Sequence, residues 1–144
     1  MNGVQIHDLE ENSGHLAVDL VDVLIALGER GSSSEWLLEP LKNSNGYFWA
    51  IGDDVAEIFE VWGESGTKVD GKTLIVASAK ARQVIDGKAS GFDDLNTTSP
   101  WVVIIAVDSS WYEVYASDEA VLNMIRNTFK DVRPAGAYPE KWTS

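Results

Sequence analysis

The stretch "WVVIIAVDSSWYEVYA" at residues 101–116 decides the fold of this chain. Its first part, "WVVIIAV", is an uninterrupted apolar run, which is typical of a strand that is buried on both faces. The "DSS" that follows predicts a tight turn, and "WYEVYA" at 111–116 predicts the partner strand of a β-hairpin. The C-terminal third of the chain is therefore expected to be built on a buried hairpin.

A helix is predicted directly after this hairpin. Ser117 can cap its N-terminus, and Asp118 and Glu119 lie where the helix dipole favours negative charge. Its buried face would consist of Val121, Leu122, Ile125, Phe129 and Val132. Because Pro134 cannot continue the helix, residues 134–144 are predicted to form a tail that is frayed or docked.

Two more segments are assigned by working towards the N-terminus. Residues 15–27, "HLAVDLVDVLIAL", have the spacing of a largely buried helix, with Ser13 as its cap and Gly28 as its stop. Residues 35–41 and 47–51 are predicted as two strands joined through "KNSNG", since Asn-Gly favours a hairpin turn.

The segment "DDVAEIFEVWGE" at 53–64 is best explained as an amphipathic helix. A step of about 100° per residue places four carboxylates on one side: Asp53, Glu57, Glu60 and Glu64. The same step places four apolar residues on the opposite side: Val55, Ile58, Phe59 and Trp62. A strand would mix acidic and apolar residues on each face, so a helix is preferred.

The region between this helix and the hairpin is harder to assign. Residues 73–86, "TLIVASAKARQVID", fit either a strand or a helix, and we favour a strand at 73–78 followed by a short helical or extended piece. Residues 87–100 are polar and rich in turn-forming residues, so they are predicted to be a loop and the most mobile part of the chain.

These elements predict a single α+β domain at 1–133, followed by the tail at 134–144. Its sheet would be mainly antiparallel, built from hairpins and packed against an N-terminal, a middle and a C-terminal helix. A length of 144 residues with 44% hydrophobic residues suits one domain with one core.

The net charge of −12 is the strongest compositional signal. It argues against direct binding to nucleic acids or to anionic membranes, which need Lys and Arg to replace counterions. It favours a basic protein as partner, although acidity that only keeps the protein in solution is the alternative. The apolar run at 101–107 is too short to cross a bilayer, and the N-terminus has no secretory pattern, so we expect a cytoplasmic location.

One segment matches a nucleotide-binding motif. Gly66, Gly71, Lys72 and Thr73 in "GTKVDGKT" satisfy G-x-x-x-x-G-K-[ST], and Asp108 after the apolar run could complete a magnesium site. A P-loop must follow a buried strand and open a helix, whereas here a predicted helix precedes it and a predicted strand follows. An Asp-Gly turn between strands is therefore preferred, and the nucleotide site is the alternative.

Other catalytic or metal-binding chemistry has little support in the sequence. The chain has no cysteine, and the spacing of His7 and His15 does not suggest a zinc site, so we predict neither a metal nor a cofactor. Asp93 and Asp94 could join another acid in a carboxylate pair or cation site, or could simply be solvated. Because no catalytic residue can be named, an enzyme is the less favoured class.

The preferred hypothesis is a non-catalytic interaction or inhibitor module, similar in charge and size to immunity proteins, that acts on a basic partner. Its contact surface would be the acidic helix face of Asp53, Glu57, Glu60 and Glu64. Trp36, which has polar neighbours, is the candidate for an exposed aromatic contact. The alternative function is nucleotide binding through residues 66–73.

Overall fold

A computed structural model describes residues 1–41 and 46–139, and it confirms a single-domain α+β fold with a mainly antiparallel sheet. The strands are β1 (Asn2–Ile6), β2 (Glu35–Glu39), β3 (Trp49–Ile51), β4 (Val69–Asp70), β5 (Gln83–Phe92), β6 (Val102–Val107), β7 (Trp111–Ala116) and β8 (Val132–Ala137). The helices are α1 (Leu20–Ala26), α2 (Gly28–Ser33), α3 (Ala56–Ser65), α4 (Gly71–Lys80) and α5 (Glu119–Thr128). None of the helices in this described part of the chain has the length and apolar character needed to cross a bilayer.

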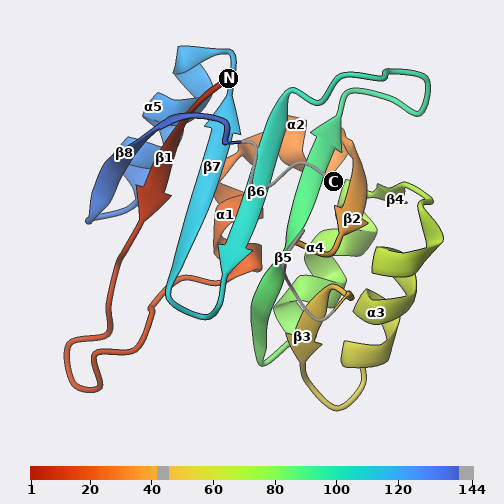
Figure 1. The fold of residues 1–144 in the computed structure, drawn as a ribbon, viewed down its shortest axis with the longest axis horizontal. Helices are drawn as coiled ribbons and strands as arrows, with labels where there is room; N and C mark the ends of the chain where they lie inside the picture. Colours follow the sequence, from red (N-terminus) through yellow and green to blue (C-terminus); the bar gives the residue numbers. More distant parts are fainter. Residues whose placement is uncertain (42–45, 140–144) are drawn as a thin grey trace.

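The strands form one sheet in the order β4-β2-β5-β6-β7-β1-β8, and β3 also pairs with β5. Figure 1 shows α1, α2, α4 and α5 on one face of this sheet. Alternate residues of β6, among them Val102 and Ile104, point to that face and join the main core. Val103 and Ile105 point to the other face, where they form a smaller apolar cluster with Tyr115 and Leu41.

The predicted hairpin at 101–116 is confirmed as β6 and β7. Its register pairs Val102 with Ala116 and Val107 with Trp111. Asp108 and Ser109 in the turn both have positive φ angles, of 46° and 61°, which suits a tight connection between twisted strands. The helix predicted after the hairpin is also confirmed, but its cap is Asp118 rather than Ser117, and it ends at Thr128, so that Val132 belongs to β8.

The segment predicted as a frayed or docked tail, 134–144, begins inside a strand, because β8 crosses residue 133. Residues 132–137 pair antiparallel with β1, and the register shifts between Gly3 and Val4. β1 itself, at the N-terminus, was not predicted; it lies between β7 and β8. The rest of the predicted tail, 140–144, is outside the described residues.

The strand and the loop predicted between 73 and 100 are both wrong. Asp70 accepts a hydrogen bond from the Thr73 N–H at 3.0 Å, and this cap starts helix α4 where a strand was favoured. The supposed loop at 87–100 contributes its first six residues to β5, which pairs with β2, β3 and β6. β2 and β3 both run antiparallel to β5, so they are not the two arms of a hairpin; the predicted turn at 42–45 is outside the described residues.

Glycines explain why β5 resembles a loop in the sequence. A Cβ atom on Gly87 would lie 2.4 Å from the Phe48 ring, and one on Gly91 would lie 3.0 Å from the Trp36 ring. Both glycines therefore leave room for an aromatic side chain that crosses the strand.

The N-terminal helix is shorter than predicted and is anchored by a partly buried carboxylate. It begins after Asp19, which forms a capping box with Asp22. Oδ1 of Asp19 also accepts the Val84 N–H at 2.9 Å and lies 2.9 Å from the Tyr112 hydroxyl. This one oxygen therefore links α1 to β5 and β7, and burial raises the pKa of the Asp19 carboxyl.

Because its pKa is raised in the folded state, Asp19 favours folding most below its unfolded pKa of 3.8, and this contribution is lost as pH rises through the folded pKa. Asp19→Asn keeps the acceptor oxygen and does not titrate. We therefore expect the free energy of unfolding of the wild type, relative to Asp19→Asn, to fall between about pH 3 and pH 7. Urea unfolding across this range measures it; a constant difference would show that Asp19 is not desolvated.

Ser78 on α4 offers a second test of the core. In the described part of the chain, its Oγ is the one buried side-chain polar atom with no hydrogen-bond partner. Ser78→Ala removes this atom and improves helix propensity, so it should raise the free energy of unfolding by about 1 kcal/mol. The control is Ser34→Ala: Ser34 is equally buried, but its Oγ bonds the Arg30 carbonyl and the Trp101 indole, so this variant should be destabilised in the same urea titration.

Candidate functional site

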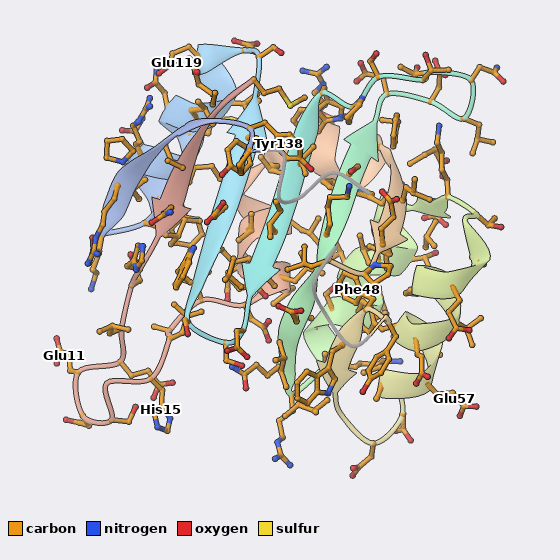
Figure 2. The ribbon with its side chains drawn as sticks, viewed as in Figure 1. Glu11, His15, Phe48, Glu57, Glu119 and Tyr138 are labelled. Atoms are coloured by element: carbon orange, nitrogen blue, oxygen red, sulfur yellow. The ribbon has the colours of Figure 1, made fainter. Side chains whose placement is uncertain are left out.

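The acidic residues predicted to face a partner do lie on one exposed surface. Glu57, Glu60 and Glu64 are on α3, and Asp53 is in the turn before it. All four are exposed, and none forms an ion pair with another residue in the described ranges. Figure 2 shows Glu57 at the outer side of α3, pointing away from the sheet.

Aromatic packing fixes the orientation of α3. Phe59 is buried and stacks on Phe48 with ring centroids 5.5 Å apart, while Trp62 meets Phe59 edge to face at the same distance. Gly63 lies against the backbone and Cβ of Phe48, because a Cβ there would be 2.7 Å from the Phe48 Cβ. With this side of the helix fixed, the acidic residues can only face solvent.

The apolar side of α3 is less buried than the helical wheel predicts. Ile58, on the predicted apolar side of the helix, is 41% exposed, and Val61, next to the acidic residues, is 57% exposed. Val76 on the neighbouring α4 is 56% exposed. Three large aliphatic side chains on adjacent helices are therefore in contact with solvent. Single exposed apolar residues are common on protein surfaces, but a cluster of them is typical of an interaction site.

Ile58 and Val76 line a groove between α3 and α4 of about 500 Å³, which we call the α3–α4 groove. Its apolar lining is Val55, Ile58, Trp62, Val76 and Ala77. Asp54 borders it on the α3 side, and Lys72 and Lys80 border it on the α4 side. A second hollow of about 420 Å³ continues over α3 and includes Asp53, Glu57 and Val61. The four acids of this surface, which we call the acidic row (Asp53, Glu57, Glu60 and Glu64), thus adjoin the groove through Asp53 and Glu57.

The sequence carried a signal for the hollow over α3 that the helical wheel did not include. Val61 falls outside the apolar arc, between two glutamates, where a purely solvated helix face would have a polar residue. The α4 side of the groove, with Val76 between Lys72 and Lys80, could not be predicted because a strand was favoured for this segment.

The expectation that Trp36 makes an exposed contact is wrong. Its side chain is fully buried, and its indole N–H donates to the Gly31 carbonyl at 2.9 Å. Trp36 also meets Trp101 edge to face, with ring centroids 6.4 Å apart. It holds β2 against α2 and has no access to a partner.

The motif residues at 66–73 are already bonded within the protein. Asp70 accepts from the Thr73 N–H and, at 2.6 Å, from its hydroxyl, and the Gly71 N–H donates to the Ser34 carbonyl at 2.8 Å. Gly66 is the left-handed C-cap of α3. A helix does follow the motif, unlike the predicted strand, but an anionic side chain occupies the position that a phosphate would need.

The structure does not bring Asp108 to this motif. Asp70 pairs with Glu35, and Glu35 pairs with Phe92, so the motif lies at the Val102 end of the sheet. Asp108 follows the other end of β6, six residues or about 20 Å away along the strand. The two halves of the supposed nucleotide site are therefore separated by the length of the sheet.

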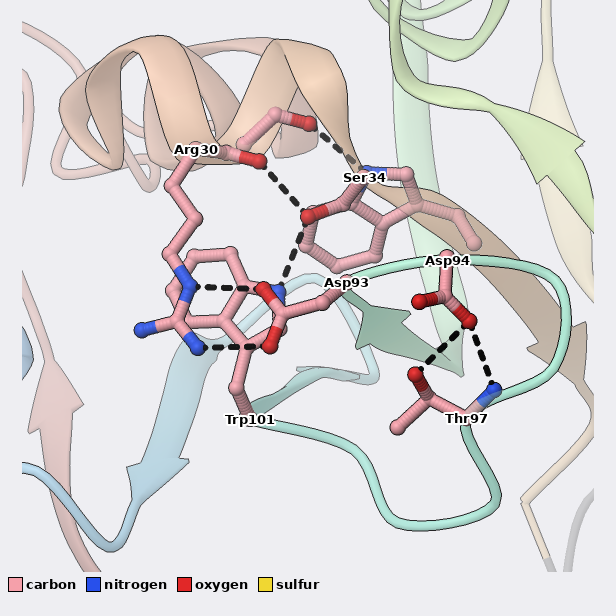
Figure 3. A network of polar contacts seen from close by, with 8 residues as sticks. Arg30, Ser34, Asp93, Asp94, Thr97 and Trp101 are labelled. Carbon is pink, nitrogen blue, oxygen red and sulfur yellow. Dashed lines mark hydrogen bonds and ion pairs between the residues drawn. The ribbon is translucent and has the colours of Figure 1, made fainter.

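The loop that follows β5 is tied down rather than open, as Figure 3 shows. Asp93 accepts two hydrogen bonds from the Arg30 guanidinium at 2.9 and 3.0 Å, and that guanidinium lies 4.2 Å above the Trp101 ring. Asp94 accepts from the Thr97 hydroxyl and from the N–H groups of Asn96 and Thr97. These bonds hold the pKa of each of the two carboxyls below its usual value. Both side chains therefore stabilise the conformation of the loop, and they do not form a catalytic pair of carboxylates.

A buried carboxylate on the open face of the sheet was not foreseen. Glu113 on β7 is 1% exposed and accepts from the Tyr115 hydroxyl at 2.5 Å and the Trp111 indole at 2.8 Å. His7 stacks on Trp111 and hydrogen-bonds Gln5, while burial and Arg133 lower the pKa of His7. No nucleophile accompanies this network in the contacts described.

No group of three His, Cys, Asp or Glu residues that could hold a metal ion occurs within 1–41 and 46–139.

Gly71 provides the test of how the 66–73 segment is used. A Cβ there would lie 2.4 Å from the Gly31 carbonyl oxygen and 2.6 Å from that of Ser32. We expect Gly71→Ala to lower the free energy of unfolding by about 1–3 kcal/mol, because backbone atoms must move. The exposed Lys72→Ala is the control and should remain close to wild type.

The wild type and Lys72→Ala also test whether the 66–73 segment binds a nucleotide. Millimolar ATP with Mg²⁺ should leave the melting temperature of the wild type unchanged, since Asp70 already bonds the N-terminus of α4, where a phosphate would have to bind. A rise in melting temperature that Lys72→Ala abolishes would contradict the packing explanation and restore the nucleotide site.

Comparisons of the chain with known protein families, with curated protein sequences and with solved structures find no match. The surface of α3 and α4 therefore supplies the observations on which a function can be proposed.

Proposed function

We propose that this protein is a non-catalytic, cytoplasmic interaction module that binds a basic protein through α3, in the manner of an inhibitor or immunity protein. The single observation that carries the proposal is the placing of exposed Ile58 and Val61 directly beside the acidic row of α3. Interfaces combine an apolar centre with a charged rim, whereas a merely solvated helix face has no need of the apolar part.

The charge of the chain supports the same kind of partner. A net charge of −12 gives the molecule a long-range attraction for basic surfaces, and the α3 carboxylates concentrate it at one place. Complementary charge mainly raises the association rate and the specificity, and the apolar contacts slow dissociation. Nucleic acids and anionic membranes would be repelled by this surface, so we do not propose them as direct partners.

Nucleotide binding is the weaker candidate. It would require Asp70 to release the N-terminus of α4 and Thr73 to give up its hydrogen bond. We therefore keep it only as an alternative that the ATP titration addresses.

The proposal is tested with two variants of equal charge change. The first replaces the acidic row, by Asp53→Asn, Glu57→Gln, Glu60→Gln and Glu64→Gln. The control replaces four exposed acids outside α3, by Glu10→Gln, Glu11→Gln, Glu29→Gln and Glu119→Gln. Proteins retained from a lysate of the source organism are identified, purified and titrated against both variants. We expect the first variant to lose about tenfold or more in affinity at low salt, and the control to lose much less.

Equal losses in both variants would mean that only net charge matters, and no loss in either would remove the acidic row from the interface. Unfolding curves of the two variants serve as the folding check. Since all eight residues are exposed, both proteins should unfold at urea concentrations close to that of the wild type.

A further inference from the structure

We propose that the α3–α4 groove binds a single amphipathic helix of the partner, whose apolar stripe is flanked by Lys or Arg on the α3 side and by Asp or Glu on the α4 side. The inference rests on the proposed interaction function and specifies the partner segment that the surface accepts. It is carried by three features of the groove: its apolar lining, its helical walls and the opposite charges of its two rims.

The lining calls for large apolar side chains. Trp62 and Ala77 lie within the groove, and Ile58 and Val76 project from its two walls into solvent. A partner that inserts leucine-sized side chains would cover these four residues and remove their apolar surface from water. A purely basic, extended and polar segment would leave that surface uncovered.

The walls favour a helix over an extended strand. Both sides of the groove are α-helices of ten residues, and backbone N–H and C=O groups within a helix are already paired. Strand addition needs a free sheet edge, which the groove does not provide. A helix presents apolar residues at i, i+3 or i+4, and i+7, and about three turns of it match the roughly 15 Å length of α3 and α4.

The rims determine the charge pattern of the partner. Asp53, Asp54 and Glu57 lie on the α3 side. Lys72 and Lys80 lie on the α4 side, eight residues apart and therefore on one face of that helix. Both lysines are exposed, and neither forms an ion pair with a described residue. A partner with basic residues on both flanks would meet like charge at α4, so the groove selects for asymmetric flanks.

Two synthetic peptides of identical composition test this inference. Each is a helix of about three turns with leucines at the spacing above; one has Lys on one flank and Glu on the other, and its counterpart has the same Lys and Glu residues mixed on both flanks. Binding is followed by NMR shifts of the methyl groups of Ile58, Val61 and Val76, which detect weak complexes. We expect the peptide with separated charges to bind at least about fivefold more tightly and to shift Ile58 and Val76, which line the groove.

Variants then assign the effect to the groove. Val76→Glu changes an exposed residue, so the protein should fold, and we expect it to abolish the shifts at Ile58. Lys72→Glu with Lys80→Glu should remove the preference between the peptides, while Lys72→Gln with Lys80→Gln should only weaken it. Equal binding of both peptides by the wild type, shifts at Val61 without shifts at Ile58 and Val76, or self-association of the protein through Val76 in sedimentation experiments would each overturn the proposal.

The outcome can be separated from that of the proposed function. If the purified natural partner is lost by the acidic-row variant but still binds Val76→Glu, the interaction function stands and the groove is not its site. If Val76→Glu loses the partner and the acidic-row variant keeps it, the groove proposal stands without its acidic rim, and the acidic-face hypothesis fails.

Discussion

The rest of the structure depends on β5, a ten-residue strand that is paired along both of its sides and crossed by two aromatic rings. Phe48 occupies the space above Gly87, and Trp36 occupies the space above Gly91. Phe48 in turn stacks on Phe59 and so positions α3. The Trp36 indole N–H donates a hydrogen bond to the Gly31 carbonyl of α2, and its ring contacts Trp101. Any side chain at either glycine would displace the ring that fixes a helix, so the arrangement of the α3 surface begins in the middle of the sheet.

The elements that could be predicted from the sequence are those whose signals are local. The hairpin of β6 and β7 has a continuous apolar run and a turn, and α3 and α5 have apolar residues at helical spacing. β5 could not be predicted in the same way, because Gly87 and Gly91 lower strand propensity and are explained only by rings from distant segments. The residues of α4 fit both a strand and a helix, and the helix forms because the Asp70 side chain caps its N-terminus. β1 depends on pairing with β7 and β8, which lie more than a hundred residues away in the sequence.

The candidate site could be predicted in part for the same reason. The acidic row of α3 could be predicted from helix geometry alone. The groove could not, because its other wall is α4, and the sequence of that segment fits a strand as well as a helix. Trp36 shows the opposite error, since polar neighbours along the chain suggested exposure but β2 turns the indole inward. For Gly71, Lys72 and Thr73 the motif spacing was real, but Asp70 within it satisfies the groups that the motif would offer to a phosphate.

The two outer strands of the sheet have a consequence for behaviour at high concentration. β4 has only two residues, and β8 contains Pro134, which lacks an N–H, opposite the register shift in β1. Neither edge is a long, regular row of free donors and acceptors, so neither is a good template for adding a strand from another molecule. The protein can therefore keep a partly apolar surface on α3 and α4 without that surface being accompanied by edges that promote fibril-like stacking.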